Sequence, residues 1–249
     1  MRPPMLNKRT LPLCLGIALL SGSVHAGPAD YVYMPTVDYG EKEIDFKFGT
    51  AEQPSGETKQ VASLGLGYGA TDWWFTEVYI KTEHESPAPR LNILELENKF
   101  QLTETGKYPL EVGLITEFEF PLNQEGEPYE FKFGPLFQTE FDKLQLNGNL
   151  LLETKFGEGN PTETAFLYQW QAKYRWHKEF EFGLQGFGET GEWDDWAQSD
   201  EQEYKMGPAI FGKVQAGDHA AIKYNAAWLI GMTDATPDNT FRVQVEYEF

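Results

Sequence analysis

The chain is poor in cysteine and in basic residues, and it has no long hydrophobic run beyond its N-terminus. Its only cysteine is Cys14. If the first 26 residues are removed on export, the remaining chain can form no disulfide, thiolate catalyst or cysteine-ligated metal site. The sequence contains 20 basic and 39 acidic residues. This acidity argues against a nucleic-acid partner, which needs a basic surface.

Residues 1–26 have the features of a secretory signal peptide. Arg2, Lys8 and Arg9 precede an apolar stretch of about ten residues, and a small residue, Ala26, offers a cleavage site before Gly27. The apolar stretch is too short to cross a bilayer as a helix. We therefore expect a signal peptide at residues 1–26 and one exported domain at residues 27–249.

Beyond residue 26 the sequence alternates between apolar and polar residues. In the clearest segment, Phe166, Tyr168 and Trp170 alternate with Gln169 and Gln171. Such a period of two is typical of strands with one face in an apolar medium and the other in a polar one. Twelve segments show it, and no convincing amphipathic helix is present. They cover residues 43–48, 63–68, 74–81, 94–102, 110–120, 129–141, 144–156, 166–176, 180–184, 205–214, 222–230 and 241–249.

The connections between these segments alternate in length. The odd-numbered ones are long and rich in Gly, Pro and acid, whereas the even-numbered ones are tight, and only residues 103–107 approach five. Outer-membrane barrels have short periplasmic turns, longer outer loops and an even number of strands. The sequence therefore predicts an all-β fold, a transmembrane antiparallel up-and-down β-barrel of about 12 strands.

A secreted soluble β-sandwich or calyx is the main structural alternative, because it also alternates apolar and polar residues. In that fold the aromatic faces would point inward and the charges outward. Twelve aromatic-rich faces would crowd a small closed core, and the rhythm of the connections would have no role. The membrane barrel is favoured for these two reasons.

The last strand adds a family resemblance. Residues 241–249 alternate strictly and end in Phe249, with Tyr247 two residues earlier. This segment resembles the closing strand of Gram-negative outer-membrane β-barrels. The resemblance implies outer-membrane lipid and lipopolysaccharide as surroundings, and recognition by the barrel-assembly machinery through Tyr247 and Phe249. The whole pattern is also similar to the outer-membrane channels of the phenol-degradation meta-pathway family, which implies uptake of small organic molecules.

The expected barrel is wide enough for small solutes. Twelve strands about 4.8 Å apart and tilted by about 40° close into a cylinder with a backbone radius of about 12 Å. Inward side chains would leave a passage of about 8–12 Å. No segment looks like a plug domain. We therefore predict passive passage of small polar or organic solutes, without a catalytic group, metal or cofactor. An occluded structural or interaction barrel is the alternative.

One hypothesis for the inward charges is an acidic wall that faces a basic wall, and so a transverse field across the lumen. The alternative is local pairing, with Arg175 beside Glu181 across a turn. The same register places Lys213 opposite Lys223, an unfavourable contact unless an acid lies between them. The predicted pore-lining and solute-binding residues are Glu95, Glu97, Glu111, Glu117, Glu119, Lys173, Arg175, Lys205, Lys213 and Lys223.

An enzymatic barrel is a further alternative. His84-Glu85-Ser86 resembles the His-x-Ser arrangement of outer-membrane phospholipase and lipid A deacylase barrels, and nucleophilic catalysis needs this pair plus an orienting group. In this chain, however, Pro87 follows Ser86 directly, and the Asn-containing sequence that usually comes after this motif is missing. Asp194-Asp195 resembles the acids of omptin-type proteases only loosely, with no partner histidine. We expect no enzyme.

Overall fold

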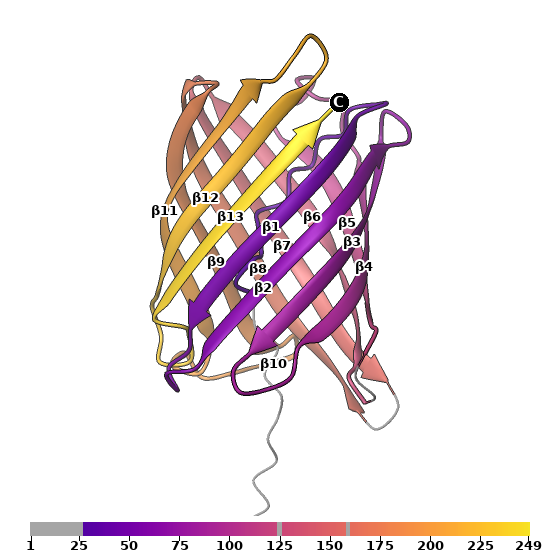
Figure 1. The fold of residues 1–249 in the computed structure, drawn as a ribbon. Coiled ribbons are helices and arrows are strands. Elements are labelled where there is room, and N and C mark those ends of the chain that lie inside the picture. The colour runs from indigo at the N-terminus through magenta and orange to yellow at the C-terminus, as the bar shows by residue number, and fades with distance from the viewer. Residues whose placement is uncertain (1–26, 124–125, 158–159) are drawn as a thin grey trace, which may run out of the picture.

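The computed structural model describes residues 27–123, 126–157 and 160–249; the signal peptide expected at residues 1–26 lies outside them. The strands form one antiparallel sheet that closes into a barrel, because β13 pairs with β1 (Figure 1). The short β10 pairs only with the end of β9. The strands are β1 (Lys42–Glu52), β2 (Thr58–Gly69), β3 (Trp74–Glu85), β4 (Leu91–Gln101), β5 (Glu111–Pro121), β6 (Tyr129–Phe141), β7 (Leu144–Gly157), β8 (Asn160–His177), β9 (Phe180–Glu192), β10 (Asp195–Trp196), β11 (Glu203–Gln215), β12 (Ala221–Gly231) and β13 (Asn239–Glu248).

This architecture confirms the predicted fold. Each of the twelve alternating segments falls on one of the twelve long strands. β10 is the one strand of the described chain that the alternation does not predict. No helix within the described ranges has the length and apolarity needed to cross a membrane.

The side chains face as the alternation predicts. On the outside, Leu66 is 66% exposed and Trp228 is 55% exposed. On the inside, Asp45 is 1% exposed and Arg242 is 2% exposed. Polar residues therefore fill the interior and apolar residues cover the outer surface, the reverse of a soluble protein and the arrangement of a lipid-facing barrel.

The lengths of the connections differ between the two ends of the barrel, although less than the sequence suggests. The end that carries Phe249, here called the C-terminal rim, also holds the connections at residues 70–73, 102–110, 142–143, 178–179 and 216–220 (Figure 1). The connection at residues 102–110 is longer than expected. At the opposite rim, β7 ends at Gly157 and β8 begins at Asn160, so these two strands extend into a region predicted from the sequence to be a long connection.

Candidate functional site

The barrel interior is occupied by the stretch of chain that precedes β1. We call residues 27–41 the plug segment; it runs inside the barrel behind β13 and β1 in Figure 1. Val32 and Tyr33 are each only 5% exposed. A Cβ at Gly49 of β1 would lie 2.1 Å from the carbonyl oxygen of Pro28, so only glycine allows this close backbone approach. The sequence predicts no plug domain, and this segment was not singled out from it. The plug is a short segment rather than a domain.

Two tyrosines of the plug segment bind the acidic side of the barrel. The hydroxyl of Tyr31 donates to Glu97 of β4 at 2.8 Å, and the hydroxyl of Tyr33 donates to Glu117 of β5 at 2.7 Å. Both acceptors are buried carboxylates. Hydrogen bonds to charged acceptors are the stronger kind, so these two contacts are main anchors of the plug.

The plug backbone is held from other sides of the barrel. Arg242 of β13 donates to the carbonyl oxygen of Asp30 at 2.6 Å, and Asn149 of β7 donates to that of Tyr33 at 3.2 Å. Near the C-terminal rim, the amide of Val37 donates to Gln101 at 2.7 Å. Inward side chains thus replace the sheet hydrogen bonds that this extended segment lacks.

Apolar contacts clamp the plug between two patches of the inner wall. Tyr33 packs with Ile115, Leu136 and other residues of β5 to β8. Val32 packs with a second patch on β9, β11 and β12. Consecutive residues of an extended chain point in opposite directions, so Val32 and Tyr33 reach different walls. The second patch consists of Phe187, Ala209, Phe211, Ala227 and Leu229.

The predicted acidic residues of β4 and β5 face one another inside the barrel. Glu95 lies opposite Glu119, and Glu97 lies opposite Glu117. Lysines compensate part of this charge: Lys81 binds Glu119 at 2.7 Å and Lys132 binds Glu117 at 2.9 Å. Glu111, nearer the C-terminal rim, accepts a hydrogen bond from Gln138 at 2.8 Å.

The predicted basic residues are mostly held in local ion pairs. Lys173 binds Glu181 at 3.2 Å, and Arg175 binds Glu140 at 2.8 Å. The expected pair of Arg175 with Glu181 is therefore wrong. In the strand register Lys173 lies opposite Gly183, and its side chain reaches diagonally to Glu181; the register shifts only beyond this point, between Tyr174 and His177. Lys205 lies deeper, where it donates to the carbonyl oxygen of Gly27 at 3.4 Å.

Lys213 and Lys223 lie directly opposite each other on β11 and β12, as the sequence predicts. Glu248 of β13 forms ion pairs with both lysines, at 2.5 Å to Lys213. Lys223 also binds Glu41 at 3.1 Å and Glu246 at 3.2 Å. The acid expected between the two lysines is thus present, and it belongs to the chain itself.

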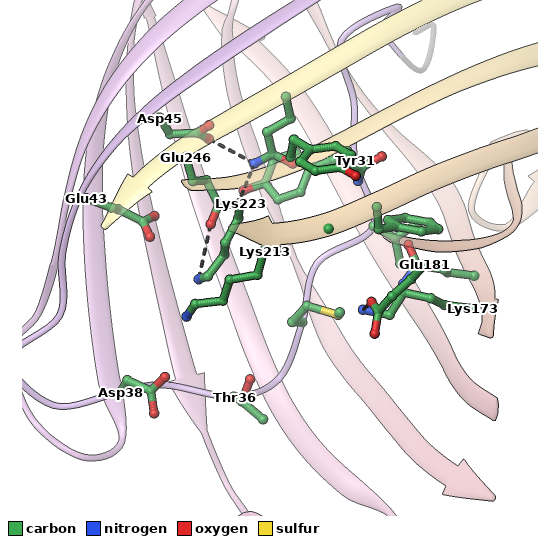
Figure 2. Close-up of a pocket in the computed structure, with 18 of the residues that line it drawn as sticks. Tyr31, Thr36, Asp38, Glu43, Asp45, Lys173, Glu181, Lys213, Lys223 and Glu246 are labelled. Atoms are coloured by element: carbon green, nitrogen blue, oxygen red, sulfur yellow. Dashed lines mark hydrogen bonds and ion pairs between the residues drawn. The ribbon is translucent and has the colours of Figure 1, made fainter. Parts of the chain in front are cut away.

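A cavity of about 620 Å³ lies inside the barrel on the C-terminal side of the plug. We call it the vestibule; Figure 2 shows Glu43 and the ammonium groups of Lys213 and Lys223 pointing toward one another within it, with Lys173 and Glu181 farther off. Five predicted site residues line the vestibule: Glu97, Lys173, Arg175, Lys213 and Lys223. Glu95 and Glu117 line a second, small cavity of about 30 Å³. Glu111, Glu119 and Lys205 line neither.

Several lining residues were not singled out from the sequence. They include Glu43, Asp45 and Glu77, and Tyr31 of the plug segment. The alternation along β1 and β3 places Glu43, Asp45 and Glu77 on the inner face, so the sequence does contain a signal for them. Two carboxylate triplets of the described chain have oxygens within 4.8 Å of one another: Glu41, Glu43, Glu248 and Glu95, Glu117, Glu119. Lysines already bind members of both triplets, so neither needs a metal ion.

The His84 and Ser86 pair does not form a catalytic arrangement. His84 is at the end of β3, and its Nδ1 is buried with no hydrogen-bond partner in the described part of the chain. Ser86 lies just beyond the strand, where its amide donates to the carbonyl oxygen of Thr58. A triad needs a third group that orients the imidazole, and the described residues supply none at Nδ1.

No protein-family model matches the chain, and no curated protein matches it in sequence. Solved outer-membrane barrels match it in fold. The NanC porin is 10% identical with a TM-score of 0.57, over 84% of this chain and 100% of that one. The KdgM porin is 10% identical with a TM-score of 0.56, over 83% and 99%. The COG4313 outer membrane channel from Pseudomonas putida F1 is 14% identical with a TM-score of 0.55, over 90% and 99%.

These likenesses show the fold, which is that of outer-membrane porins and channels. At the level of the fold, they confirm the resemblance to outer-membrane β-barrel channels. The KdgM porin has also been solved in complex with disordered oligogalacturonate.

Proposed function

We propose that this protein is an outer-membrane channel for small polar or organic solutes and that it conducts when the plug segment leaves the lumen. The observation that carries this proposal is the composition of the interior. The inner face of the barrel is polar and charged, and the interior is occupied by a segment held through side-chain contacts rather than through the sheet. Such contacts can be broken while the barrel wall remains intact.

The proposed placement follows outer-membrane topology. The C-terminal rim faces the periplasm and the opposite rim faces the cell exterior. Residues 1–26 direct export and are removed before assembly. Tyr247 and Phe249 stack on the outer surface with ring centroids 5.7 Å apart, in a position where the barrel-assembly machinery can recognise them. Outer-membrane lipid and lipopolysaccharide surround the apolar belt.

Charge on the inner wall is proposed to select the solute. Glu97 and other acids lie on β1 to β5, whereas Lys173, Lys213 and Lys223 lie on β8, β11 and β12. A solute that crosses the vestibule therefore passes between an acidic side and a side where lysines are paired with glutamates. The ten residues predicted from the sequence remain our proposed lining set.

The plug also favours a second candidate, an occluded barrel with a structural or interaction role. In that case the anchors of Tyr31 and Tyr33 would never release, and the interior would serve only to stabilise the fold. The two candidates differ in a measurable property, which is conductance.

Recordings in planar lipid bilayers test the proposal. We compare the protein that begins at Gly27 with a variant that lacks residues 28–37. The channel proposal predicts brief openings for the intact protein and a steady open level for the deletion variant, because the segment that fills the lumen is gone. Silence from both proteins, each shown to be folded by its heat-dependent gel mobility, would support the occluded barrel and reject the channel.

A further inference from the structure

A row of inward-facing acids crosses the wall beside the vestibule. In the strand register, Glu43 of β1 is opposite Gly67 of β2, Gly67 is opposite Glu77 of β3, and Glu77 is opposite Glu97 of β4. The three carboxylates line the vestibule and are at most 8% exposed. Like charges directly opposite each other on neighbouring strands, as Glu77 and Glu97 are, destabilise a sheet, so a positive charge bound beside the row would stabilise it.

The chain does not supply that charge within ion-pair distance. Across the described ranges, no lysine, arginine or histidine nitrogen lies within 4.0 Å of the carboxylates of Glu43, Glu77 or Glu97. Glu97 accepts one hydrogen bond, from Tyr31. This distinguishes the row from Glu117 beside it, which binds Lys132 at 2.9 Å.

Unpartnered oxygen atoms are an independent sign of a missing ligand. Oε1 of Glu77 and Oδ1 of Asp45 are buried and have no hydrogen-bond partner among the described residues. The two side chains are 2% and 1% exposed, and both border the vestibule. Buried carboxylate oxygens without partners are costly, and structures that keep them commonly place a ligand, water or ion there.

The cations that line the vestibule are already engaged elsewhere. Lys173, Arg175, Lys213 and Lys223 each bind a glutamate of the chain at 3.2 Å or less. Lys99 is different, because it lies 4.9 Å from the ring centre of Phe75 and forms no ion pair in the described ranges. On the side of β1 to β4, Lys47 binds Oδ2 of Asp45 at 3.6 Å, whereas Glu43, Glu77 and Glu97 have no ion-pair partner among the described residues.

The size and lining of the cavity indicate an organic molecule rather than a bare ion. A volume of about 620 Å³ is far larger than the ~30 Å³ that one water molecule occupies in the liquid. Aromatic side chains from both walls and from the plug line it. They are Tyr31, Phe75, Tyr79, Trp176, Phe211 and Tyr224.

We infer that the vestibule is a binding site for a small organic cation, an amine whose ammonium group lies against Glu43 and Glu77, beside the unpartnered Oδ1 of Asp45, and whose apolar part packs on the aromatic residues. Gly67 leaves the wall without a side chain between Glu43 and Glu77. A Cβ at Gly67 would lie 2.5 Å from Phe75 and 2.8 Å from Glu43. The glycine thus allows the ring of Phe75 and the side chain of Glu43 to meet at this point of the wall.

Titration calorimetry on the detergent-solubilised protein tests this site without any need for conduction. The probes are benzylamine, benzyl alcohol and benzoate, which share a ring and differ in charge. We expect benzylamine to bind at least about tenfold more tightly than the other two probes, because only its ammonium group can pair with the carboxylates. Equal affinity for benzylamine and benzyl alcohol would reject a cation site.

The matched variants are Glu77→Gln and Glu104→Gln. Glu104 carries the same side chain but is exposed outside the vestibule, where it binds Lys107 at 2.9 Å. Benzylamine binding should weaken about tenfold in Glu77→Gln and stay unchanged in Glu104→Gln. Unchanged binding in a folded Glu77→Gln, or complete competition by millimolar sodium or calcium, would overturn the assignment to an organic cation. Binding by a protein that proves silent in bilayers would separate this inference from the channel proposal.

Discussion

Replacing Tyr33 with phenylalanine should loosen the plug while leaving its apolar packing in place. The substitution removes only the hydroxyl that donates to Glu117 at 2.7 Å. The ring stays among Ile115, Leu136 and Leu151. The variant therefore isolates one hydrogen bond of the closed state.

The magnitude follows from the contacts of Glu117. A hydrogen bond to a charged group contributes about 1.5–3 kcal/mol. Glu117 keeps the ammonium of Lys132 at 2.9 Å, so the carboxylate is not left without a partner and the lower end of this range applies. About 1.4 kcal/mol corresponds to a factor of ten in an equilibrium. We therefore expect Tyr33→Phe to raise the ratio of open to closed states about tenfold.

Single-channel recording measures this ratio directly, from the time spent at each current level. Tyr39→Phe is the matched control, because Tyr39 belongs to the same segment and is 73% exposed. It should behave like the unsubstituted protein. If Tyr33→Phe shows the open probability of the unsubstituted protein while deletion of residues 28–37 opens the pore, the Tyr33 anchor has no part in keeping the lumen closed.

Three further predictions concern the C-terminal rim. Burial and a hydrogen bond with Glu248 raise the pKa of Glu41 to about 7. The folded protein therefore binds this proton more tightly than the unfolded chain does, and thermal stability in detergent should fall as the pH rises from about 5 to about 8. Glu41→Gln should flatten that slope, and an unchanged slope would show that Glu41 does not cause it. Replacing both Lys213 and Lys223 with Gln leaves Glu248 and Glu246 without a lysine partner. The reversal potential in a salt gradient should then shift toward cation selectivity. An unchanged reversal potential would reject a role for these lysines in the pore. Removing Phe249 should lower the amount of folded barrel in the outer membrane, and an unaltered amount would exclude it as an assembly signal.

Most of the barrel could be predicted from the sequence because its signal is local. A strand between lipid and a polar interior must alternate, and segments such as residues 166–176 do so almost without exception. The alternation also gives the direction of each side chain, which places Glu95 and Lys213 inside. The partner of each charged side chain is harder to predict. Glu181 binds Lys173 diagonally across the sheet, and Arg175 binds Glu140 of another strand instead.

The plug could not be predicted in the same way. Residues 27–41 contain Pro28 and Pro35 and lack alternation, so nothing local marks them as part of the interior. An indirect signal is nevertheless present. Ile115, Leu136 and Phe187 are apolar residues at inward positions of otherwise polar strands, and each is at most 1% exposed. Apolar residues that face a lumen indicate that something other than water covers them.

A reversible covalent lock on the plug tests the central claim most directly. A Cβ at Gly113 of β5 would lie 3.0 Å from the Cβ and 2.9 Å from the Cα of Pro35, so Pro35→Cys with Gly113→Cys forms a disulfide once the plug backbone moves back to a Cβ separation of about 3.8 Å. The chain that begins at Gly27 has no other cysteine. We predict that the oxidised double variant is silent in planar bilayers and that a reductant restores openings, whereas neither single variant responds. Equal conductance before and after reduction, with the disulfide verified by mass, would contradict the claim that displacement of residues 27–41 opens this barrel.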